Sequence, residues 1–110
     1  MLKLAKRAQF TAQAQIWIAG EEKPESFSVT FKYLTKKEWD SLAEESDSNK
    51  DKGFALPQII IDWHDVCDEN GNQIPYTKEN LDTILDLFPS ATGDIINCYV
   101  RELFASRIKN

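Results

Sequence analysis

The chain has 110 residues, of which 42% are hydrophobic and 11% aromatic, and its net charge at pH 7 is −5. The negative charge argues against a nucleic-acid binder, because such proteins neutralise phosphates with clustered Lys and Arg. No apolar run reaches the roughly eighteen residues of a transmembrane helix, and no segment resembles an export signal. We therefore expect a cytoplasmic protein with a single domain that spans residues 1–110.

The first elements expected along the chain are two strands joined by a polar loop. Residues 1–9 are basic and are expected to form a mobile tail. Apolar and polar residues then alternate in 10–18 and again in 27–33, which is the period of a half-buried strand. The loop between them is too short for a parallel crossover. The sequence therefore predicts an antiparallel β-hairpin over residues 10–34, with its apolar face covered by the rest of the chain.

The helical part is expected to begin directly after the hairpin and to occupy residues 35–110. Thr35 and Glu38 have the spacing of a capping box, in which each side chain accepts a backbone N–H at the start of a helix. The following apolar residues recur at spacings of three and four, as on one face of a helix. The polar segment 46–53 is then expected to end this helix in a solvated loop and to be the most mobile interior segment.

The next apolar run, residues 54–62, has two interpretations. It can be a buried strand, or it can be a helix with Pro57 in its first turn, because the periodicity of so short a run fits both. We favour the helix.

Two further helices are expected in the C-terminal third. Thr77 is placed to cap the first of them, and Pro89 is placed to end it. The last helix is expected to carry a broad apolar face that extends as far as Ile108. These elements predict an α+β fold in which an N-terminal antiparallel β-hairpin packs on a bundle of three to four α-helices.

The segment Asp68–Asn72, with the sequence DENGN, has some features of a calcium-binding loop. If Gly71 stood at the sixth loop position, Val66 and Thr77 would stand at the first and last ligand positions, where calcium requires an Asp and a Glu. A tight turn explains the same residues, because Asn and Gly readily adopt positive φ angles. We therefore predict a turn without a metal.

Other metal and catalytic sites find little support in the sequence. His64, Cys67 and Cys98 supply three potential zinc ligands, and Asp65 would complete a set of four only by coincidence. We expect both cysteines to be free, partly buried thiols. No nucleophile stands beside a base in a pattern typical of covalent catalysis. We predict no metal, no cofactor and no enzymatic activity.

The sequence indicates a surface for a protein partner. Acidic residues predominate between Asp62 and Asp86, so a partner that contacts this face is expected to be basic. Trp63 stands between polar neighbours, which is consistent with an interface anchor, although packing in the core is the interpretation that we favour. The residues that we predict to contact a partner are Asp62, Trp63, Asp65, Tyr76, Asp82 and Tyr99.

From about Phe27 onward, the order of short motifs resembles that of phage tail assembly chaperones. The matching features are a Y-L-T-x-x-E helix start, the apolar run that leads into Trp63, and a P-Y-T opening of the next helix at residues 75–77. A terminal helix with a tyrosine near its centre is matched by Tyr99.

This resemblance implies a small, non-enzymatic protein of a tailed phage or prophage of the siphophage type, acting in the cytoplasm of the bacterial host. Its partners would be the tape measure protein, which it coats, and the tail tube protein, which it recruits. It implies no nucleic-acid or membrane partner, and repeated copies on a long rod make a homo-oligomer a further expectation. The alternative is a structural tail component, such as a tail completion or tube-associated protein, that stays in the virion. A third interpretation, an acidic mimic of nucleic acid, requires a regular spacing of acids that the sequence lacks.

Overall fold

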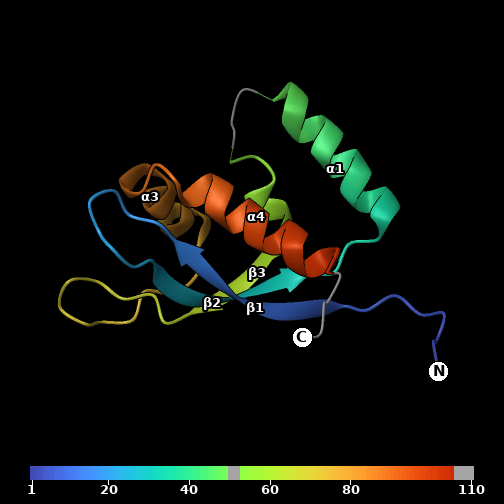
Figure 1. Ribbon diagram of the computed structural model, residues 1–110, viewed down its shortest axis with the longest axis horizontal. Coiled ribbons are helices and arrows are strands. Elements are labelled where there is room, and N and C mark those ends of the chain that lie inside the picture. Colours follow the sequence, from blue (N-terminus) through green and yellow to red (C-terminus); the bar gives the residue numbers. More distant parts are fainter. Residues whose placement is uncertain (50–52, 106–110) are drawn as a thin grey trace.

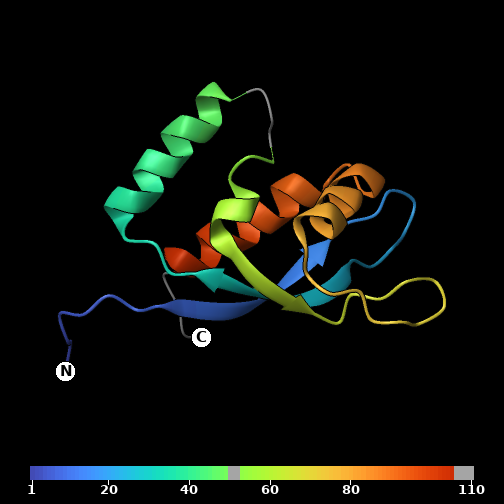
Figure 2. The ribbon, with the colours of Figure 1, turned by 180° about the vertical axis from the view of Figure 1, so that it is seen from behind.

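The computed structural model, which describes residues 1–49 and 53–105, combines a three-stranded antiparallel sheet with four helices (Figure 1). The elements in chain order are β1 (Gln9–Ile16), β2 (Glu25–Lys32), α1 (Lys36–Ser48), α2 (Leu56–Ile59), β3 (Ile60–His64), α3 (Lys78–Leu87) and α4 (Ala91–Leu103). The strand order is β1-β2-β3. All four helices lie on one side of the sheet, and we call its other side, which no helix of the described residues covers, the open side (Figures 1 and 2).

The predicted N-terminal hairpin is confirmed. β1 and β2 pair antiparallel from Gln9↔Lys32 to Ile16↔Glu25. Apart from the half-buried Phe10, the apolar residues on the helix side of both strands are buried, whereas the Gln, Ser and Thr residues between them face the open side. Alternation with a period of two thus specified both the strands and the face that forms the core.

The structure corrects the interpretation of residues 54–62 as a helix. Only the single turn of α2 is helical, with Pro57 in its first turn, and the chain then continues as β3. β3 pairs with β2 through Val29↔Trp63, with a bulge opposite Thr30 and Phe31. The physical reason is the run of consecutive isoleucines, whose β-branched side chains favour an extended backbone and extend the sheet by one strand.

The last helix, α4, covers the apolar face of the sheet. Its buried residues are Ala91, Ile95, Cys98 and Tyr99, and it packs mainly against β1. α4 ends at Leu103. Ile108, to which the apolar face of this helix was predicted to extend, lies outside the described residues. α4 and the hairpin together form the centre of the hydrophobic core.

The first helix, α1, lies at the margin of this core, against which Trp39 and Leu42 pack (Figures 1 and 2). None of its residues is fully buried, and the ring of Trp39 lies 5.5 Å from the ring of Tyr99. The predicted capping box is present, because Thr35 Oγ1 accepts the Glu38 N–H at 3.2 Å and Glu38 Oε1 accepts the Thr35 N–H at 2.9 Å. α1 therefore depends on its cap and on a few side-chain contacts for its position.

The capping box predicts a specific acid sensitivity of α1. The Lys6 ammonium and the Thr35 N–H lower the pKa of Glu38 from 4.5 to about 2. Because the folded pKa lies below the unfolded one, the stabilisation is complete above about pH 4.5 and is lost as the pH falls through about 2. Far-UV circular dichroism should show helix loss in this window. Glu38→Gln, which keeps an acceptor for the Thr35 N–H, should remove this part of the transition; an unchanged acid profile would contradict the assignment.

Candidate partner-binding surface

Most of the residues predicted to contact a partner are Trp63 and residues around it, with Tyr76 and Asp82 on its side of the sheet and Asp62 facing the opposite side. The rings of Trp63 and Tyr76 meet edge to face with centroids 5.0 Å apart. Asp82 lies close enough to Tyr76 to raise the pKa of its hydroxyl, although burial is the larger cause. Asp62 and Asp65 flank the same tryptophan along β3 and just beyond it. We call this region, formed by Asp62, Trp63, Asp65, Tyr76 and Asp82, the acidic end.

Trp63 belongs to the core of the acidic end and not to its surface. Its side chain is 3% exposed, its indole N–H donates to the Ile74 carbonyl at 2.8 Å, and its ring meets that of Phe27 edge to face. The polar neighbours that suggested an exposed position face outward, because alternation along the strand places them on the opposite side. Core packing, the favoured interpretation, therefore describes this tryptophan.

Tyr99 lies apart from the acidic end and is fully buried. Its nearest ring partners are Phe10, Phe31 and Trp39. Burial raises the pKa of its hydroxyl. Direct contact of a partner with Tyr99 or Trp63 would require the core to open, and such contact stays a prediction.

The three carboxylates of the acidic end are exposed, and contact with a partner stays a prediction for them. Asp62 Oδ1 accepts the Trp63 N–H at 2.8 Å, and its other oxygen lies 3.8 Å from His64 Nε2. Asp82 makes an exposed ion pair with Lys78 at 3.3 Å. Asp65 has a φ of 66°, in the left-handed region that Asp and Asn tolerate better than most residues. These weak surface contacts leave the carboxylates available to a cationic partner.

The DENGN segment next to the acidic end is a turn, as predicted. Asp68 Oδ1 accepts the N–H groups of Asn70 and Asn72 at 2.9 and 3.0 Å, and Gly71 has a φ of 84°. These donors lower the pKa of Asp68, with the Asn72 N–H as the largest cause. The carboxylate therefore acts as the organiser of the turn.

The two thiols are free and occupy different environments. Cys67 is exposed, which corrects its expected partial burial, whereas Cys98 is buried. Burial raises the pKa of Cys98, and its thiol donates to the Gln13 carbonyl at 3.6 Å. Across residues 1–49 and 53–105, no three His, Cys, Asp or Glu side chains come together as metal ligands. Within the same residues, no helix has the length and apolar character needed to cross a membrane.

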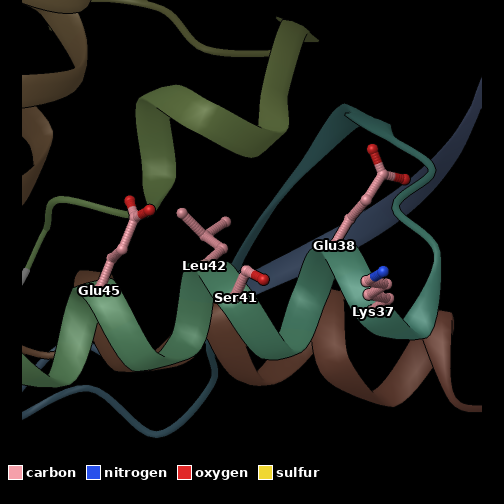
Figure 3. Close-up of a pocket in the computed structure, with 5 residues that line it drawn as sticks. All are labelled: Lys37, Glu38, Ser41, Leu42 and Glu45. Atoms are coloured by element: carbon pink, nitrogen blue, oxygen red, sulfur yellow. The ribbon is translucent and has the colours of Figure 1, made fainter.

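Sequence reasoning missed an open depression along α1. It has a volume of about 380 Å³ and is lined by Lys37, Glu38, Ser41, Leu42 and Glu45. Figure 3 shows Leu42 and Glu45 projecting toward the α2 segment. The lining residues recur at spacings of three and four, so the sequence could have shown that they share one face of the helix. The mixed charges around one leucine suit a contact with another polypeptide better than a reaction centre.

Comparison with known proteins identifies a family. The model of a family described as phage tail assembly chaperone matches residues 1–110, which is the whole chain. No curated protein and no solved structure matches the chain.

Proposed function

The chain belongs to the phage tail assembly chaperone family, and on this premise we propose that it binds the tape measure protein and helps to recruit tail tube subunits without catalysing a reaction. The match of the family model to the entire chain carries this proposal. The proposed place of action is the cytoplasm of the bacterial host.

The acidic end supports a charge-based contact with such a partner. Asp62, Asp65 and Asp82 are exposed, and Lys78 is paired with the last of them. A partner segment that is rich in Lys or Arg would be attracted to this surface, with a strong dependence on salt. Because a tape measure protein is long, many weak contacts of this kind would gain strength through avidity.

A role in binding, rather than catalysis, also agrees with the shifted titratable groups of the described residues. Glu38 caps α1 and Asp68 organises a turn. The pKa values of Tyr76, Cys98 and Tyr99 are raised mainly by burial. Each of these shifts has a structural cause, so none of them calls for a catalytic role.

Co-expression with the tape measure protein from the same gene cluster tests the proposal. The tagged chain should retain the tape measure protein in soluble form. Asp62→Asn, Asp65→Asn and Asp82→Asn together should weaken this retention by about tenfold, because three exposed charges are lost at the acidic end. A matched variant on α1, Asp40→Asn with Glu44→Gln and Asp47→Asn, removes the same charge outside the depression, including one exposed pair with a lysine, and should bind as the native chain does.

Two results would contradict this proposal. If the folded native chain does not retain the tape measure protein, the chaperone role with this partner fails. Detection of the chain in purified virions by mass spectrometry would then favour the structural tail component. If both triple variants lose binding equally, net charge and not the acidic end governs the interaction.

A further inference from the structure

β1 forms one edge of the sheet, and alternate residues along it direct their backbone groups outward. The Tyr33 N–H donates to the Ala8 carbonyl at 3.1 Å, and the register of the hairpin continues from this pair. In an antiparallel ladder, the bonded pairs alternate along the strand. The even-numbered residues of β1 therefore bond to β2, whereas the N–H and C=O groups of Gln9, Thr11, Gln13 and Gln15 point away from the sheet.

The rest of the described chain reaches this outward row at two places, Trp17 and the Gln13 carbonyl. Asp94 Oδ2 accepts the Trp17 N–H at 2.9 Å, and Ser90 Oγ donates to the Trp17 carbonyl at 2.6 Å. Within the row itself, the Gln13 carbonyl accepts the long bond from the Cys98 thiol. No described group bonds to the outward backbone groups of Gln9, Thr11 or Gln15. We call the outward side of Gln9–Gln15 the open edge.

The opposite edge of the sheet is protected. β3 is short and carries a bulge where it pairs with Thr30 and Phe31. The Asp62 carboxylate accepts the Trp63 N–H, and Asp65 turns the chain away with its positive φ. Bulges, short length and acidic side chains are the devices by which proteins prevent an edge strand from pairing. β1 has eight residues and none of these devices.

Charge and exposure along β1 indicate what can pair with it. No charged residue occurs from Ala8 to Gly20. Arg7 stands before the strand and donates only to the Lys3 and Ala5 carbonyls, whereas Glu21 and Glu22 follow the turn. The open edge is therefore neutral along its length, with the basic Arg7 before it and the acidic Glu21 and Glu22 after it. Trp17, which is 54% exposed, adds an aromatic anchor on the side of Glu21 and Glu22.

We propose that the open edge binds an extended segment of a partner protein, which adds to the sheet as a fourth, antiparallel strand. The segment is uncharged at its centre, with basic residues before the centre and acidic residues after it. In the antiparallel direction, the basic residues of the bound segment meet Glu21 and Glu22, and its acidic residues meet Arg7. Backbone bonds supply affinity in this mode of recognition, and the flanking charges set direction. The proposal goes beyond the chaperone role and does not depend on which tail protein is bound.

A second copy of the chain is a poorer occupant than a single strand. Antiparallel pairing of two β1 edges would place both α4 helices on the same side of the joined sheet. α4 packs over β1, and Ser90, Asp94 and Cys98 reach its outward groups. Paired strands lie about 4.8 Å apart, whereas packed helices need about 8–10 Å between their axes. A lone extended segment brings no helix of its own, and within Gln9–Gln15 it has to replace only the long bond from the Cys98 thiol to the Gln13 carbonyl.

Titration of the ¹⁵N-labelled chain with a synthetic peptide tests the open edge. The peptide has an alternating Thr-Val centre, lysines at its amino end and glutamates at its carboxyl end. We expect the amide signals of Thr11, Gln13 and Gln15 to shift and their hydrogen exchange to slow by about tenfold, because these N–H groups gain acceptors. The same peptide with its charged ends exchanged should bind more weakly; stronger binding of that control would overturn the antiparallel direction.

Two matched variants separate strand pairing from other contacts. Thr11→Pro removes an outward N–H that the internal ladder does not use, and it should weaken peptide binding by about tenfold. Thr11→Val keeps that N–H and should bind as the native chain does, although both variants lose the 3.1 Å hydroxyl contact with Thr30. If Thr11→Pro does not fold, Gln15→Pro with Gln15→Val repeats the comparison. Equal binding by a folded Pro variant and its Val control, or native shifts that avoid these amides, would overturn the proposal.

Discussion

Tyr99→Ala is expected to lower the free energy of unfolding by about 3–5 kcal/mol, as removal of a fully buried aromatic ring typically does. The ring lies 5.0 Å from Phe31, 5.6 Å from Phe10 and 5.5 Å from Trp39, measured between centroids. It thus joins α4 to both strands of the hairpin and to α1. Because a domain of this size has only about 5–15 kcal/mol of stability, urea denaturation should show a large fall in the midpoint.

Tyr99→Phe isolates the contribution of the hydroxyl in the same position. The hydroxyl donates to the Lys32 carbonyl at 2.9 Å and accepts the Leu34 N–H at 3.3 Å. Its removal leaves both backbone groups without this partner at the exit of β2, so we expect a loss of about 1–3 kcal/mol. If the Ala and Phe variants are equally stable, the ring contacts contribute little, and the inference that the Tyr99 ring joins α4 to the hairpin and to α1 is wrong.

Local patterns in the sequence predicted the hairpin and the helix starts. Alternation fixed β1 and β2, and Thr35 and Thr77 cap the helices that they were expected to begin. The strand interpretation of residues 54–62 was not the favoured one, because a short apolar run has no diagnostic period and the pairing of β3 with β2 is a long-range contact. The joining role of Tyr99 depends on the same kind of contact, between residues far apart in the sequence.

The candidate surface was predictable as a charge pattern but not as a set of exposed side chains. The acidic end is visible in the sequence between Asp62 and Asp86, and its carboxylates are exposed as expected. The burial of Trp63 was the favoured interpretation, although Asp62 and His64 suggested that the chain was leaving the core. The open edge of β1 was also hidden, since the position of a strand within a sheet depends on pairings that the local sequence does not specify.

Trp63→Ala is expected to destabilise the free chain by about 3–5 kcal/mol. The substitution removes an indole that packs between Phe27 and Tyr76 and leaves the Ile74 carbonyl without its donor. It also removes the inward residue of β3 that faces Val29 across the sheet. Thermal unfolding, followed by near-ultraviolet circular dichroism, should show a markedly lower midpoint together with loss of the aromatic signal.

Trp63→Phe distinguishes a core role from direct contact with a partner. Phenylalanine retains most of the apolar packing but cannot donate to the Ile74 carbonyl, so we expect a smaller loss of about 1–3 kcal/mol. Because the indole is buried, the folded Phe variant should retain the tape measure protein as well as the native chain does in the co-expression assay. Weaker retention by a Phe variant of near-native stability would show that Trp63 contacts the partner after all, and that the acidic end opens when it binds.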